Sequence, residues 1–208
     1  MSRTTVILVH GLWMVSPVMG YLGRAFRRLG HSTVTFGYAS RGHDLDYNAA
    51  LLNRRIAAVP SASIAIVAHS YGGVVSLRAL NLSPNPRVQR VVLLGSPVAG
   101  SAAGRSLAQS RPWRLALGRT ASVWEEGPAV SVPRETAVGA IAGARPRGLS
   151  RFVTRLDGDN DGVVRIAETK IPGLADHLTM ATSHSTMLVA DDVARQAEYF
   201  IRHGRFSR

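Results

Sequence analysis

The chain has no cysteine, a single lysine and no long apolar run in its 208 residues. Without cysteine it can form neither disulfides nor thiolate-ligated metal sites, so any nucleophile must be a hydroxyl, a carboxylate or an amine. Apolar runs such as 6–9, 64–68 and 91–94 are too short to cross the roughly 30 Å apolar layer of a bilayer. The first residues also carry no signal-peptide pattern, so we expect a cytoplasmic protein.

Acidic residues are scarce as well. The sequence has 13 aspartates and glutamates against 25 lysines and arginines, which gives a formal net charge of +12. A field of this sign attracts polyanions, but the arginines are scattered from Arg3 to Arg208 and follow no nucleic-acid-binding motif. We therefore expect no nucleic acid partner and keep a non-catalytic protein that binds polyanions through its arginine-rich surface as an alternative.

Strand-like and helix-like segments alternate along the chain, and 46% of the residues are hydrophobic. Uninterrupted β-branched runs indicate strands that are buried on both faces, and their alternation with helices predicts an α/β fold with a doubly wound, mostly parallel sheet in three layers. We expect one domain over residues 1–208. Expected strands lie at 5–9, 33–36, 64–68, 91–94, 137–141, 152–156 and 177–180, and expected helices at 17–29, 47–59, 73–82 and 191–203, the first with Ser16 as its N-cap.

A candidate nucleophile follows the expected strand at 64–68. The segment Ala68-His69-Ser70-Tyr71-Gly72 has the A-x-S-x-G pattern of a nucleophile elbow, in which small residues let the strand and the next helix pack around a strained serine. The Tyr71 amide would then lie at a helix N-terminus and face a developing anion. The Leu12 amide, in the loop after the first strand, is the predicted second donor of an oxyanion hole.

A serine hydroxyl needs a base to take its proton and an acid to orient that base. His184 is the predicted base, because it lies in a loop between the last strand and the last helix. His177 and His203 fall inside regular elements, and His10, which we interpret as a structural anchor of its glycine turn, precedes the acid region. His31, His43 and His69 also precede the acid region in the sequence.

Two motifs overlap where the acid is expected. Residues 157–168 match the calcium-loop pattern D-x-D-x-D-G-x₅-E, but Pro172 follows soon after Glu168, where a calcium-binding hand needs a helix. We therefore predict that Asp161 orients His184, with Asp159 as the reserve and Asp157 as a solvated turn residue. A structural calcium ion held by Asp157, Asp159, Asp161 and Glu168 is the remaining alternative; otherwise we expect no metal and no cofactor.

The order Ser70, Asp161, His184 resembles an α/β-hydrolase. The A-H-S-x-G elbow, the H-G-L-W segment at 10–13, the D-G-V-V acid loop and the S-H-S-x-M-L histidine loop resemble small bacterial lipases and esterases without a large lid. The resemblance implies hydrolysis of carboxylic esters with short to medium acyl chains through an acyl-enzyme. A thioesterase or acyltransferase with the same triad is an alternative, because the pocket chooses the leaving group and the acceptor.

Residues 98–134 lack the strand rhythm and interleave leucines and tryptophans with arginines. This pattern fits a surface helix over the sheet, or a small cap that forms a pocket wall or makes transient contact with anionic lipid. The predicted pocket residues are Trp13, Trp113 and Met187. The expected partner is a small ester, and the expected assembly is a monomer or a small homo-oligomer.

Overall fold

The computed structural model describes residues 4–146 and 156–208. Within these ranges six parallel strands form one sheet in the order β2-β1-β3-β4-β5-β6. The central strands consist of β-branched and aliphatic residues that are buried on both faces, as a doubly covered parallel sheet requires. The strands are β1 (Thr5–Val9), β2 (Ser32–Phe36), β3 (Ile64–His69), β4 (Val88–Leu94), β5 (Ala137–Gly143) and β6 (Asp176–Met180).

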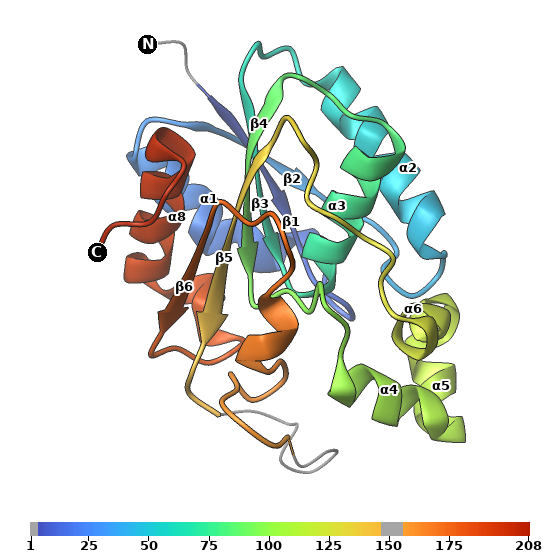
Figure 1. Cartoon of the computed structure of the whole chain (residues 1–208). Helices are drawn as coiled ribbons and strands as arrows, with labels where there is room; N and C mark the ends of the chain where they lie inside the picture. The colour runs from blue at the N-terminus through green and yellow to red at the C-terminus, as the bar shows by residue number, and fades with distance from the viewer. Residues whose placement is uncertain (1–3, 147–155) are drawn as a thin grey trace.

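Helices cover both faces of the sheet, which gives three layers (Figure 1). Helices α1 (Gly20–Arg28) and α8 (Asp191–His203) pack on one face, where Phe26 and Phe200 join a core with Val67 of β3. Helices α2 (Leu45–Ala58) and α3 (Tyr71–Leu82) pack on the other face, where Leu52 and Leu77 are buried with other apolar side chains. The predicted three-layer α/β fold is confirmed.

Residues 98–134 contain no strand; 102–126 form a group of short helices beside the carboxyl ends of the strands, and the chain then runs back along α3 (Figure 1). We call this group the cap. It consists of α4 (Ala102–Gln109), α5 (Arg111–Leu117), the 3-10 turn η2 (Gly118–Thr120) and α6 (Ala121–Glu126). The Trp124 side chain of α6 is buried and packs edge-on against Tyr71, which attaches the cap to the start of α3.

The start of the first helix differs from the prediction. The first helix begins as a 3-10 turn, η1 (Ser16–Met19), whose N-cap is Val15 and not Ser16, and no side chain caps it. The 3-10 turns η3 (Ile166–Thr169) and η4 (Thr186–Val189) complete the elements. The expected strand at 152–156 falls outside the described residues, except for Leu156, which is irregular. No helix in the described ranges combines the length and apolar character needed to cross a membrane.

Candidate active site

Ser70 occupies a strained turn between β3 and α3. Its backbone has φ 54° and ψ −128°, a conformation that L-residues rarely adopt and that persists only when the surroundings impose it. The surroundings do so through close contact: a Cβ atom on Gly72 would lie 2.4 Å from the His10 carbonyl oxygen, and one on Gly73 would lie 2.2 Å from Ser96 Oγ. The strain places a partly exposed serine at the carboxyl end of the sheet, where parallel folds position reactive groups.

His184 and Asp161 are joined by a short hydrogen bond. The Nδ1 atom of His184 lies 2.7 Å from Asp161 Oδ2, and both side chains are buried. The backbone amide of His184 also donates to the Asp161 carbonyl oxygen at 2.9 Å. Because the carboxylate accepts the Nδ1 proton, the neutral ring keeps its Nε2 lone pair available as a base.

The Asp161 carboxylate is itself held by the acid loop. Its Oδ1 atom accepts hydrogen bonds from the amides of Val163 and Val164 at 2.9 and 2.7 Å, which leaves Oδ2 for the imidazole. Asp157 and Asp159 are exposed, and the Glu168 carboxylate accepts hydrogen bonds from the Ala102 amide and from Arg165. Among the described residues no group of three or more histidine, aspartate and glutamate side chains is arranged to hold a metal ion.

Ser70 and His184 line the same cavity, whose volume is about 390 Å³. The Ser70 hydroxyl makes no hydrogen bond to a described residue. A serine and its base often come into hydrogen-bond range only when substrate binds. The two predicted oxyanion-hole residues, Leu12 and Tyr71, line the cavity as well, and within 4–146 and 156–208 neither backbone amide donates to a protein acceptor. These amides are therefore available to a ligand.

The cavity wall is mostly apolar and combines the loop after β1 with the cap. Trp13 and Trp113 both line it, whereas Met187 does not: the Met187 side chain is fully buried and belongs to the core under α8. The wall consists of Leu12, Trp13, Met14, Ser70, Tyr71, Ser101, Ala103, Gly104, Leu107, Trp113, Leu117, Trp124, Val163 and His184.

Two further histidines support the site without entering the cavity. Burial lowers the pKa of His10, whose Nδ1 donates to the Gly11 carbonyl at 2.9 Å, so the neutral ring anchors the loop that carries Leu12. Burial also lowers the pKa of His69 to about 3. The Nε2 atom of His69 donates to the His184 carbonyl oxygen at 2.9 Å, which ties the histidine loop to the residue preceding Ser70.

Sequence reasoning missed the role of His69. The only signal was its position inside the A-H-S-x-G pattern, and its distance of 115 residues from His184 hid the contact. Sequence reasoning also missed Glu168, whose buried Oε1 atom accepts from the amide of Ala102 at 2.6 Å at the start of α4. Glu168 therefore connects the segment after the acid loop to the cap.

Comparison with known families agrees with this geometry. Residues 6–205 match the model of a family described as "Alpha/beta hydrolase family". The chain belongs to this family. The matched range of this α/β hydrolase includes the elbow, the acid loop and the histidine loop. No curated protein matches the sequence.

Solved structures show how widely this hydrolase fold is shared. The mature lipase BlEst2 of Bacillus licheniformis superposes with a TM-score of 0.78 at 20% identity, covering 98% of this chain and 92% of that one. A metagenomic carboxyl esterase gives 0.68 at 20% identity, with coverage of 98% and 75%. Tomato methylketone synthase I with bound beta-ketoheptanoate gives 0.65 at 13% identity, with coverage of 98% and 100%. At these identities the similarity establishes the fold.

Proposed function

We propose that this α/β hydrolase cleaves carboxylic esters through an acyl-enzyme formed on Ser70. The observation that carries the proposal is the buried Asp161–His184 hydrogen bond at the rim of the cavity that also contains the strained Ser70. A carboxylate on Nδ1 fixes the imidazole tautomer in which Nε2 is the base, and this tautomer is the one that serine activation needs. The lipase and carboxyl esterase among the similar structures support the same reaction class.

In the acylation step the Ser70 oxygen attacks the ester carbonyl carbon while His184 Nε2 takes the hydroxyl proton. The carbonyl oxygen becomes an oxyanion, which the Leu12 and Tyr71 amides stabilise; the N-terminal end of the α3 dipole favours the same charge. When the tetrahedral intermediate collapses, the imidazolium returns the proton to the alkoxide leaving group. The alcohol departs and the acyl group remains on Ser70.

Water then repeats the sequence. His184 takes a proton from the water as its oxygen attacks the acyl carbon, the same amides hold the second oxyanion, and the proton returns to Ser70 as the acid leaves. Asp161 stays ionised throughout and stabilises the imidazolium that forms in both steps. We propose a short to medium acyl chain, because the wall is apolar and the volume of about 390 Å³ is at the lower end for small-molecule pockets.

Hydrolysis of p-nitrophenyl esters of graded acyl length tests the reaction, and labelling by a fluorophosphonate tests the nucleophile. We expect wild type and Ser83→Ala, which alters the exposed serine at the other end of α3, to hydrolyse the esters and to take one label. Ser70→Ala should do neither. Unchanged labelling of Ser70→Ala would exclude Ser70 as the nucleophile. A thioester cleaved faster than the matched oxygen ester would favour a thioesterase.

A further inference from the structure

Within the described residues the proposed base, His184, makes three hydrogen bonds. Its Nδ1 donates to Asp161 Oδ2 at 2.7 Å, its amide donates to the Asp161 carbonyl oxygen at 2.9 Å, and its carbonyl oxygen accepts from His69 Nε2 at 2.9 Å. The first two bonds hold His184 to the acid loop. The third holds it to the elbow, because His69 directly precedes Ser70 in the chain.

The two imidazole rings also contact each other in a closed space. Their centroids lie 4.5 Å apart, and their planes are tilted by 50°. The His69 side chain is fully buried. The loop after β1 closes the other side, because a Cβ atom on Gly11 would lie 3.3 Å from His69 Nδ1 and 3.0 Å from Ser70 Cβ. The His69 ring therefore cannot turn without moving either His184 or the loop that carries the Leu12 amide.

The hydrogen bond to the His184 carbonyl fixes the tautomer of His69. A carbonyl oxygen only accepts, so Nε2 carries the proton and Nδ1 keeps its lone pair. This Nδ1 atom is buried and has no hydrogen-bond partner within residues 4–146 and 156–208. An unpaired buried acceptor costs stability, and a leucine at position 69 would carry no such atom. Residues that break a packing rule in this way are expected at functional sites.

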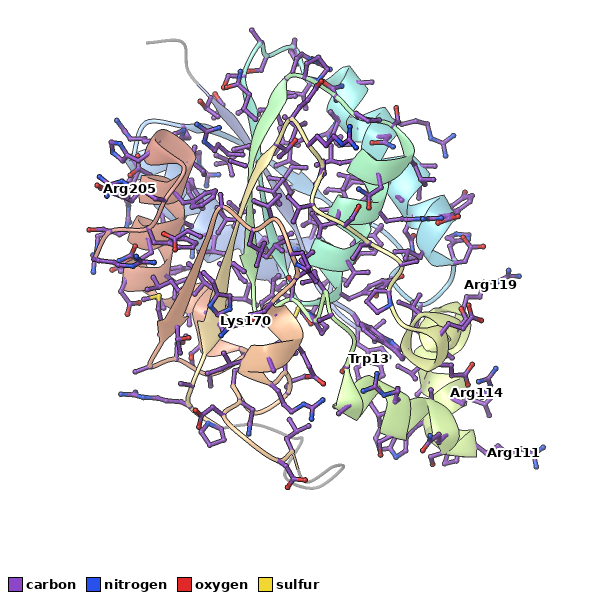
Figure 2. The ribbon with its side chains drawn as sticks, in the orientation of Figure 1. Trp13, Arg111, Arg114, Arg119, Lys170 and Arg205 are labelled. Atoms are coloured by element: carbon purple, nitrogen blue, oxygen red, sulfur yellow. The ribbon has the colours of Figure 1, made fainter. Side chains whose placement is uncertain are left out.

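The charge state of His69 suits a neighbour of the base. The proposed reaction turns the His184 ring into an imidazolium, and a second cation beside it would oppose this step. Burial lowers the pKa of His69 to about 3, and the nearby His184 and His10 rings act in the same direction. The arginines labelled in Figure 2 extend outward into solvent, away from this buried pair. His69 thus holds His184 without adding a positive charge.

We propose that His69 is a positioning residue that sets the distance between Ser70 and His184 through its hydrogen bond to the His184 carbonyl. The proposal rests on the proposed ester hydrolysis. Ser70 is fixed by the strained turn between β3 and α3, whereas His184 lies in a loop after β6. His69 extends the rigid elbow to that loop. A misplacement of about 1 Å can cost roughly a hundredfold in rate, so this link should matter for turnover.

Two substitutions at position 69 separate the hydrogen bond from the bulk of the ring. His69→Leu fills the site without a donor and should lower kcat for p-nitrophenyl butyrate about a hundredfold, with less than about a twofold change in KM, because the cavity wall is unaltered. His69→Gln places an amide N–H near the position of the imidazole Nε2 and should keep kcat at least about tenfold above that of His69→Leu. Equal kcat values for the two variants would overturn the proposal.

His31→Leu is the matched control, because it removes another buried histidine, just before β2. It breaks the contact of His31 Nε2 with Glu198 Oε1 at 3.5 Å and should lower the midpoint of urea denaturation without changing kcat. A role of His69 in stability alone would give the same result for His69→Leu. If His31→Leu lowers kcat as much as His69→Leu does, the loss reflects general destabilisation and the proposal fails.

Crystal structures of the variants give a readout that does not depend on activity. In His69→Leu the His184 ring should move by about 1 Å or occupy more than one position, and in His69→Gln and His31→Leu it should superpose on the wild-type ring. An unmoved ring in His69→Leu would contradict the positioning role. If His69→Leu does not fold, His69→Asn replaces it, because the shorter amide does not reach the His184 carbonyl.

Nitrogen-15 NMR of the histidine rings tests the hydrogen bond in the wild type, with no substitution. At neutral pH the His69 ring should carry its proton on Nε2 alone, because the carbonyl acceptor requires an Nε2–H donor. Comparison with the spectrum of His69→Gln assigns the signals. A proton on Nδ1 would show that the link to His184 does not form, and the proposal would fail even if neither His69→Leu nor His69→Asn folds.

Wild-type activity separates this proposal from the proposed function. If wild type hydrolyses p-nitrophenyl butyrate and takes the fluorophosphonate label while His69→Leu has the same kcat, the positioning role alone is wrong. If wild type does neither, the proposed ester hydrolysis is wrong. The position of the His184 ring in the His69→Leu and His69→Gln structures then decides by itself whether His69 sets the distance between Ser70 and His184.

Discussion

The rim around Ser70 and the cap that faces it are built in opposite ways. At the rim, buried polar groups from distant parts of the chain bond to one another, and the Gly72 backbone leaves no room for a methyl group. The cap consists of short helices that bury apolar side chains such as Leu117 and Trp124 in the core around α3 and expose others, among them Trp113 and Leu115. A network of buried hydrogen bonds suits groups that must be held within fractions of an ångström, whereas a wall held mainly by apolar packing suits the choice of substrate.

The contacts that attach the cap are correspondingly specific. Glu168 accepts from the amide of Ala102 at the start of α4, and Trp13 donates to the carbonyl of Ala116 near the end of α5. The Arg119 amide donates to the Arg41 carbonyl at 3.1 Å. Changes at the rim should therefore abolish chemistry or folding, and changes at these links should shift substrate affinity.

The largest expected effect is on turnover at the rim. On the proposed roles, His184→Ala should lower kcat/KM for p-nitrophenyl butyrate by roughly 10⁴-fold or more. The loss for Asp161→Asn should be smaller, about one tenth of that factor. The exposed Asp159→Asn is the control, and it should retain wild-type activity. Steady-state kinetics on folded variants measure these changes. If Asp159→Asn proves as damaging as Asp161→Asn, the assignment of the acid is wrong.

Next in size is the effect of a methyl group at the elbow. Gly72→Ala places a Cβ atom 2.4 Å from the His10 carbonyl oxygen and 2.8 Å from the Val9 carbonyl oxygen, both of them backbone atoms that cannot turn away. We expect a loss of about 3 kcal/mol or more of unfolding free energy, measured by urea denaturation. Gly20→Ala at the start of α1 meets only an arginine side chain at 3.8 Å. That variant should be as stable as wild type or slightly more stable.

Removing the charge of Glu168 should loosen the cap without reaching the rim. The carboxylate accepts from Ala102 and from Arg165, which is partly exposed, so we expect Glu168→Gln to lose about 1 to 2 kcal/mol of stability. Because α4 lines the cavity, KM should rise several-fold while kcat changes little. Chemical denaturation and ester kinetics measure the two effects. The exposed Glu126→Gln should alter neither. A fall in kcat at unchanged KM would place Glu168 in the chemistry instead.

Acid should destabilise the rim through His69. Its folded pKa of about 3 lies below the unfolded value of 6.5, so only the unfolded chain gains a proton between these values, and stability falls as the pH drops through that window. The slope from this group is at most about 1.4 kcal/mol per pH unit. His69→Gln should flatten the pH dependence of the denaturation midpoint; His203→Gln, on the exposed end of α8, should leave it unchanged. The lowered pKa of His10 adds a residual slope of the same sign.

Most of the rim could be predicted from sequence because its signals are local. Residues 5–9 and 64–68 are continuous runs of strand-forming residues, and Ser70 and His184 follow β3 and β6 in loops with recognisable patterns. Asp161 was predicted from the pattern of its loop, and the strand expected before it lies outside the described residues except for Leu156. The structure brings Asp161 and His184 together and places His184 with Ser70 on one cavity, while their catalytic roles remain a proposal. The calcium alternative stays a prediction, although Asp161 and Glu168 form hydrogen bonds with different partners, His184 and the Ala102 amide.

The cap could not be predicted in the same detail. Its helices α4 and α5 have 8 and 7 residues, about two turns each, which is too few repeats to set a clear helical pattern. Their positions also depend on long-range hydrogen bonds such as those of Trp13 and Glu168. Met187 was misplaced for a related reason. The methionine shares the histidine loop with His184, but the 3-10 turn η4 directs its side chain into the core instead of the cavity.

The smallest expected effect tests whether one hydrogen bond attaches the cap to the oxyanion loop. Trp13→Phe keeps an aromatic ring at the cavity mouth and removes the Nε1 donor to the Ala116 carbonyl, which is exposed enough for water to replace it. We expect a loss below about 1 kcal/mol in stability and a rise of KM of up to about threefold for the longer p-nitrophenyl esters, with kcat unchanged. Trp113→Phe is the control, since the Trp113 indole donates no hydrogen bond within the described residues. If Trp13→Phe lowers kcat instead, the ring positions the Leu12 amide, and the cap link and the oxyanion hole are one structural unit.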